Sequence, residues 1–195
     1  MITPPVAVNS GNWAGYEWNG SSVSASVFKV PEFPYKDMTS AEKNNHTVLS
    51  LWAGLGISPT IEQIGIYDYV QAGQVRWAGV CAFWPVVDEG CGQGISTGDE
   101  IAVSVHRTGL TYKLAMRDYG PHNVWAISIT RTLDHVDTTA ETMVEDSTYP
   151  GYPLTNLTWF SPVKVYTSGN PVTEYYSPWG YAVRNTSKQF TIYHR

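Results

Sequence analysis

Two short segments carry side chains that could work together as an acid–base pair. Residues 140–146, AETMVED, hold three acids, whereas the whole chain of 195 residues has only 17 Asp plus Glu. Residues 60–69, TIEQIGIYDY, hold the amide of Gln63. In acid medium His is already protonated, but a Glu with an ordinary pKa of about 4.3 can still exchange a proton. An amide does not titrate, so it can donate a hydrogen bond to an oxyanion at any pH.

Side chains alternate between the two faces of a strand, so spacing decides which of these residues lie together. In residues 140–146, Glu141 and Glu145 share one face and Asp146 takes the other. The face of Gln63 also carries a glycine and two aromatic rings, which could form a floor for a ligand: Gly65, Tyr67 and Tyr69. Spacing alone still favours a structural Gln63 and a solvent-facing Glu141, because a Glu on a strand is usually exposed.

Other catalytic chemistries have weaker support. Residues 94–98, GISTG, match the G-x-S-x-G pattern of serine hydrolases, but a predicted strand follows them where that mechanism needs a helix. The five histidines are scattered without the spacing of a metal site: His46, His106, His122, His135 and His194. The densest cluster, DHVD at residues 134–137, reads as a loop between strands. We therefore expect no bound metal and no cofactor.

The two cysteines, Cys81 and Cys91, are ten positions apart. In a secreted protein they would form a disulfide that closes one small loop, worth about 3 kcal/mol. In a cytosolic protein they would be two free thiols. We expect the disulfide, because no His or further Cys completes a metal site.

The elements that must position these residues are short strands. Aromatic residues make up 13% of the chain, and 17 Gly and 12 Pro punctuate it. Apolar and polar residues alternate in runs such as residues 99–106 (DEIAVSVH), 111–118 (TYKLAMRD) and 123–131 (NVWAISITR). This period of two predicts an all-β protein, an antiparallel sandwich or barrel. The length fits a single domain over residues 1–195, with residues 1–11 as an extended N-terminal segment.

Composition argues against several classes of function. The net charge is -5 and no basic cluster contains interleaved aromatics, so we expect no nucleic-acid partner. No run of about 18 apolar residues predicts a membrane span, and the start of the chain lacks the pattern of a signal peptide. Charged residues are 15% of the chain, against about 25% in an average soluble domain. Such a surface suits a harsh extracellular medium, and we expect a secreted monomer.

Six motifs, taken in order, resemble those of the glutamic peptidase family, the eqolisins. They are NWAGY (residues 12–16), LWAGLG (51–56), IEQIGI (61–66), FWP (83–85), GDEI (98–101) and AETMVED (140–146). The resemblance implies a sandwich of two curved antiparallel sheets, a concanavalin A-like jelly roll. It also implies a secreted acid endopeptidase that cleaves proteins or peptides with Gln63 and Glu141 as its catalytic dyad. Trp13 and Trp52 match tryptophans that line the family's cleft, and Tyr67 could add a further wall for substrate side chains.

Three positions depart from the family's motifs. The Asp that usually follows the W-x-G segment is missing at Leu55, Ala82 stands where the family has a Glu between aromatics, and Thr142 stands where it has a Trp. These departures concern the neighbours of the dyad, while both members of the dyad are present.

The dyad implies a mechanism. The Glu141 carboxylate would take a proton from water, Gln63 would donate to the developing oxyanion, and Glu141 would return the proton to the leaving amine. Two alternatives stay open. A lectin-like jelly roll would bind sugars on its aromatic rings without catalysis. A glycoside hydrolase would need a second carboxylate about 5–9 Å from Glu141, such as that of Glu17.

Overall fold

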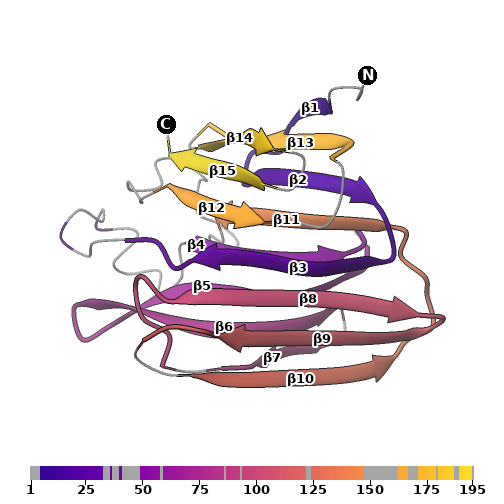
Figure 1. Ribbon diagram of the computed structural model, residues 1–195, viewed down its shortest axis with the longest axis horizontal. Helices are drawn as coiled ribbons and strands as arrows, with labels where there is room; N and C mark the ends of the chain where they lie inside the picture. The colour runs from indigo at the N-terminus through magenta and orange to yellow at the C-terminus, as the bar shows by residue number, and fades with distance from the viewer. Residues whose placement is uncertain are drawn as a thin grey trace.

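The structure is a computed structural model with two β-sheets packed face to face (Figure 1). It describes residues 5–32, 36, 40, 49–57, 59–85, 87–92, 94–121, 124–146, 162–166, 171–178, 180–186 and 189–194. In Figure 1 the strands of both sheets run along nearly the same line, as in an aligned β-sandwich. The predicted all-β sandwich is therefore confirmed, and the alternative of a closed barrel is not found.

The first sheet contains eight strands in the described part of the chain. In spatial order they are β1 (Val6–Asn9), β13 (Thr173–Tyr176), β2 (Trp13–Asn19), β11 (Thr139–Asp146), β4 (Leu49–Leu55), β5 (Ile61–Gln71), β6 (Gln74–Trp84) and β7 (Val87–Gly90). The segment expected to be extended at the N-terminus contains β1, which pairs in parallel with β13. The other pairs of this sheet are antiparallel.

Over the residues that the structure describes, the second sheet contains seven strands, all in antiparallel pairs. In spatial order they are β10 (Trp125–Thr132), β9 (Thr111–Asp118), β8 (Glu100–Thr108), β3 (Ser22–Lys29), β12 (Val163–Tyr166), β15 (Gln189–His194) and β14 (Gly180–Thr186). Among the described residues there is no helix long and apolar enough to cross a membrane.

The core lies between the sheets and follows the predicted alternation. Ile101, Val103 and Val105 of β8 are buried there. They belong to the same cluster as Ile64 and Ile66 of β5, which face them from the first sheet. Alternate residues of a strand point to opposite faces. The residues directly before and after Ile64 therefore point away from the second sheet. This side of the first sheet is called the outer face below.

The predicted disulfide between Cys81 and Cys91 is confirmed. Cys81 lies on β6 and Cys91 directly follows β7, with 5.7 Å between the two Cα atoms. Both residues are buried in the core. The bond therefore links the end of β7 to β6, which is the strand that pairs with β5.

A glycine at the centre of the outer face lets a tryptophan lie close to the sheet. Gly65 of β5 lies opposite Trp52 of β4. A Cβ atom at Gly65 would collide with the carbonyl oxygen of Leu51 and lie 2.6 Å from both the Cα and the Cβ of Trp52. Backbone atoms cannot yield as the end of a flexible side chain can, so this position requires glycine.

The substitution Gly65→Ala tests this close approach. We expect it to lower the free energy of unfolding by about 1–3 kcal/mol, because β4 and β5 must separate to admit the methyl group. Urea unfolding followed by Trp fluorescence measures the change. Gly90→Ala is the control, since a Cβ at Gly90 would meet no atom within 4 Å. Equal stability of the two variants would contradict the interpretation.

Candidate active site

The registers of three neighbouring strands bring Gln63 and Glu141 into one row. Glu141 on β11 and Gln63 on β5 both lie opposite Gly54 on the intervening strand β4. Two steps across an antiparallel sheet separate their Cα atoms by about 10 Å. Residues in one row point to the same face, so both side chains project from the outer face above Gly54. The pairing expected of the dyad is therefore present in the geometry of the sheet.

Gly54 places no side chain of its own between Gln63 and Glu141. A Cβ atom at this position would lie 3.4 Å from the Cβ of Gln63 and 3.2 Å from a ring carbon of Trp52. A side chain at position 54 would therefore crowd both neighbours. Gly54 itself is buried, as is Glu141.

Glu141 is an acid in an unfavourable position for its charge. Its side chain is fully buried, and neither carboxyl oxygen has a hydrogen-bond partner among the described residues. Burial raises the pKa of Glu141 well above its ordinary value of 4.5, and the nearby acids Glu17, Glu145 and Asp137 raise it further. Glu141 therefore keeps its proton in acid medium. Spacing alone predicted a solvent-facing Glu141, and this prediction is wrong. Gln63, in contrast to Glu141, is partly exposed.

Glu17 is the closest acid to Glu141 in the sheet. It lies directly opposite Glu141 on β2. Its oxygens accept hydrogen bonds from the Tyr175 hydroxyl at 2.8 Å and from the Thr173 hydroxyl at 3.3 Å, both on β13. These donors hold Glu17 in place beside Glu141. The sequence suggested Glu17 only as a possible second acid, and it gave no indication of Tyr175.

The second Glu of residues 140–146 has a structural partner. Glu145 accepts a hydrogen bond from Trp52 Nε1 at 2.8 Å and one from Asn12 Nδ2 at 3.2 Å. Burial raises the pKa of Glu145, and the indole groups of Trp13 and Trp52 oppose the rise. Glu145 thus ties the motif of residues 12–16 to the motif of residues 51–56.

The aromatic residues expected to bind substrate lie on the same face. Trp52 is buried, with 1% of its surface exposed. Trp13 is partly exposed and packs edge-on against Trp52, with 5.7 Å between the ring centres. Tyr67 is partly exposed on β5, four positions after Gln63 and on the same face of the sheet. Trp13 and Tyr67 are therefore accessible from solvent, whereas Trp52 is covered and packs against Trp13.

Two of the three departures from the family's motifs do not face the dyad. Thr142 and Leu55 are buried on the inner face of the sheet, where Thr142 lies opposite Tyr16 and Ala53. Ala82 lies opposite Gln63 on β6. Among these positions, Ala82 alone changes the surroundings of the dyad, by placing a methyl group where the family has an acid.

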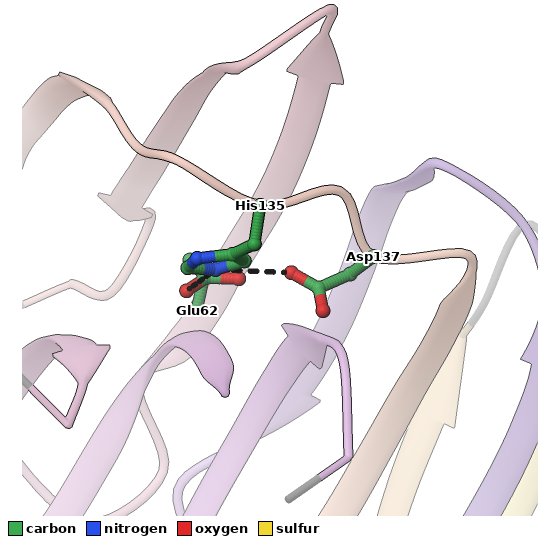
Figure 2. A group of neighbouring side chains, drawn as sticks. All are labelled: Glu62, His135 and Asp137. Atoms are coloured by element: carbon green, nitrogen blue, oxygen red, sulfur yellow. Dashed lines mark hydrogen bonds and ion pairs between the residues drawn. The ribbon is translucent and has the colours of Figure 1, made fainter. Parts of the chain in front are cut away.

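A cluster on the inner side of β5 could hold a metal ion. Glu62, His135 and Asp137 each offer one ligand atom, and these atoms lie within 4.8 Å of one another (Figure 2). Burial raises the pKa of Glu62 to about 8, and a hydrogen bond with Asp137 adds to the rise. The segment of residues 134–137 is a loop, as predicted, but the sequence did not place Glu62 beside it.

A groove on the second sheet is a separate feature. It lies over β8, β9 and β10, and its polar lining includes Ser104, Lys113 and Arg117. No described Asp or Glu lines it. It therefore lacks an acid for the chemistry that the sequence suggests, and the outer face of the first sheet is the candidate active site.

Comparisons with known proteins identify the family and the fold. A model of the peptidase A4 family matches residues 11–175 of the chain. The structure is similar to a crystal structure of scytalido-glutamic peptidase with a peptide-based transition-state analog, at 16% sequence identity and a TM-score of 0.67, covering 96% of this chain and 100% of that chain. It is also similar to aspergilloglutamic peptidase from Aspergillus niger, at 18% identity and a TM-score of 0.59, covering 75% of this chain and 98% of that chain. At such identities the likeness shows the shared fold. A search of curated protein sequences gives no match.

The buried acid predicts a stability that depends on pH. Once the pH exceeds 4.5, the ordinary pKa of Glu, the unfolded chain releases a proton that folded Glu141 retains, so stability falls as the pH rises. We expect Glu141→Gln to remove this cost and raise the free energy of unfolding at pH 7 by about 1 kcal/mol or more, which is about 2–4 °C in Tm.

At pH 3 wild type and Glu141→Gln should unfold at the same temperature, because both side chains are then neutral. Calorimetry at pH 3 and pH 7 measures the difference. Glu100→Gln, which changes an exposed acid of β8, is the control and should show no such gain. A gain for Glu141→Gln of equal size at both pH values would contradict the raised pKa.

Proposed function

The chain belongs to the peptidase A4 family and is a peptide hydrolase, and from this premise we propose that it cleaves proteins in acid medium with Gln63 and Glu141 as its catalytic dyad. The observation that carries the proposal is the row in which both residues flank Gly54 on the outer face. An amide donor and a titrating acid in one row of a sheet match the needs of peptide hydrolysis.

The raised pKa of Glu141 favours a reaction that starts from its neutral acid. Protonated Glu141 donates its proton to the carbonyl oxygen of the scissile peptide while water attacks the carbonyl carbon. Gln63 donates an amide hydrogen bond to the same oxygen, which is typically worth about 10²–10³ in rate. This order differs from the sequence-based expectation, in which the Glu141 carboxylate acts first as a base.

The later steps return every proton. The Glu141 carboxylate takes a proton from the water that has added and passes it to the leaving nitrogen, and the C–N bond then breaks. The remaining acyl group has two hydroxyls and a positive charge, and it gives one proton back to Glu141. The products are a carboxylic acid and an amine, and Glu141 is again protonated. Such acid–base assistance contributes about 10²–10⁴ in rate.

Substrate binding must expose the carboxyl group of Glu141, because the side chain is buried in the structure. We infer that a substrate chain enters above the partly exposed Gln63 and lies over Gly54. Trp13 and Tyr67 offer apolar surface to its side chains, and Trp52 holds Trp13 in position. Substrates with apolar residues beside the scissile bond fit this surface.

Two observations are consistent with an enzyme that works outside the cell. The disulfide between Cys81 and Cys91 belongs to an oxidising environment. Charged residues make up 15% of the chain, which limits the self-repulsion that a protein develops in acid. We therefore propose a secreted enzyme.

One observation fits a glycoside hydrolase. Glu17 and Glu141 are direct neighbours on adjacent strands, and side chains in such pairs start about 5 Å apart at Cβ. The family match favours peptide bonds as the substrate, and we assign Glu17 to raising the pKa of Glu141. Hydrolysis of a polysaccharide without cleavage of any protein would overturn this assignment.

The dyad is tested by cleavage of a denatured protein at pH 3–4. We expect wild type to cleave it, and Gln63→Ala and Glu141→Ala each to lower kcat/KM by at least about 10²-fold. Gly90→Ala, at the sheet edge, serves as an active control. Equal rates for wild type and both dyad variants would exclude this mechanism.

The role of Glu17 is tested through the pH profile. If protonated Glu141 starts the reaction, activity falls as the pH rises through the pKa of Glu141. Glu17→Gln removes a neighbouring negative charge, so we expect this fall to move to lower pH. Measuring kcat/KM from pH 2 to 7 shows the shift.

Glu174→Gln is the matched control, because Glu174 lies on the neighbouring strand β13 and accepts its hydrogen bond from Tyr16. Its pH profile should be that of wild type. A fall in activity that stays in place in Glu17→Gln, or moves to higher pH, would show that Glu17 does not act on Glu141.

A further inference from the structure

The cluster of Glu62, His135 and Asp137 contributes no group that contacts the substrate in the proposed reaction of the dyad, although Asp137 adds to the raised pKa of Glu141. Glu62 lies on β5 beside Gln63 but points to the opposite face, and His135 and Asp137 belong to the loop that leads into β11. His135 Nε2 lies 3.0 Å from Glu62 Oε1 and 3.5 Å from Asp137 Oδ2. Figure 2 shows the Glu62 carboxyl group beside the His135 ring, with Asp137 across from it.

These distances fit the first coordination sphere of a small cation. A tetrahedral ion with ligands at about 2.0–2.2 Å holds its ligand atoms about 3.3–3.6 Å apart. The separation of 3.5 Å lies within this range, and the separation of 3.0 Å is slightly shorter than it. One imidazole nitrogen and two carboxylate oxygens are also a donor set that Zn²⁺ accepts, whereas Mg²⁺ and Ca²⁺ prefer oxygen ligands alone.

The groups around the cluster orient its ligands. His135 Nδ1 lies 3.1 Å from Asp134 Oδ1, so an Nδ1–H donor leaves the Nε2 lone pair facing Glu62 and Asp137. Asp137 accepts hydrogen bonds from the Tyr112 hydroxyl at 2.8 Å and the Thr60 hydroxyl at 3.0 Å. Histidines that bind metals commonly donate their other nitrogen to a carboxylate in this way.

An independent observation points to a ligand at this place. Glu62 is fully buried, and its Oε2 atom has no hydrogen-bond partner among the described residues. A buried carboxylate oxygen without a partner is costly. The side chain of His135 is 26% exposed, which gives an ion a path from solvent into the cluster.

We propose that Glu62, His135 and Asp137 bind one Zn²⁺-type divalent cation, at a site separate from the catalytic dyad. The ion joins β5, next to Gln63, to Asp137, which lies four positions before Glu141. Bound there, it stabilises the folded protein, because the unfolded chain cannot hold these three ligands together. Binding displaces the protons of the ligands, so the site fills more readily as the pH rises.

The test uses the full chain at pH 7.5, without substrate. Calorimetric titration with ZnCl₂ should show one ion per chain, and Co²⁺ should give the visible absorption of a low-symmetry site. At a free Zn²⁺ concentration of 100 times Kd, we expect Tm to rise by about 5–10 °C. Because no peptide is cleaved in these measurements, their outcome is independent of the proposed dyad.

Three variants locate the ion. His135→Ala should abolish the binding, and Asp134→Asn, which changes a fully exposed residue that only orients His135, should weaken it by about 10-fold or more. His106→Ala removes an exposed histidine on β8 and should change nothing. Absence of Zn²⁺ and Co²⁺ binding by wild type would overturn the proposal. So would binding that survives both His135→Ala and Asp134→Asn unchanged, or that is lost in His106→Ala.

Discussion

The register of β11 between β2 and β4 determines where each acid of residues 140–146 points. Because side chains alternate, a slip of one residue would turn Glu141 into the apolar core and move Val144 to the outer face. Ala140 and Val144 are held in that core, so hydrophobic packing fixes the register. The same register places Glu17 on one side of Glu141 and Gly54 on the other. The candidate active site is thus positioned by apolar contacts on the opposite face of the sheet.

This arrangement has an energetic cost that follows from the same geometry. Glu141 lies at the centre of an eight-stranded sheet and is fully buried, next to Glu17 and near Glu145. Loss of solvent and the neighbouring acids both disfavour its charge. Glu145 avoids part of this cost by accepting the Trp52 indole hydrogen bond, whereas Glu141 has no such partner in the described structure. This difference between two acids on one face gives Glu145 a structural role and makes Glu141 the candidate for the reactive one.

Alternation along single strands was enough to predict the fold class and the face of the sheet to which each side chain points. It placed Ile101, Val103 and Val105 in the core and put Gln63 on the face opposite Ile64. Contacts between distant segments could not be predicted in this way, because they depend on register and on loop paths. Glu62 and His135 are 73 positions apart and still lie 3.0 Å from each other. Glu17 likewise meets Tyr175 only through the pairing of β2 with β13.

The two faces of strand β5 carry polar side chains with different partners. Gln63 points to the outer face above Gly54, and its neighbour Glu62 points inward to His135 and Asp137. A strand in a sandwich usually keeps polar groups on one face, since buried acids need partners. Here the inward acid has such partners in a loop that leads directly into β11. The polar contacts of that loop and the apolar contacts of the core therefore act on the same two strands, β5 and β11, and together they hold Gln63 and Glu141 on either side of Gly54.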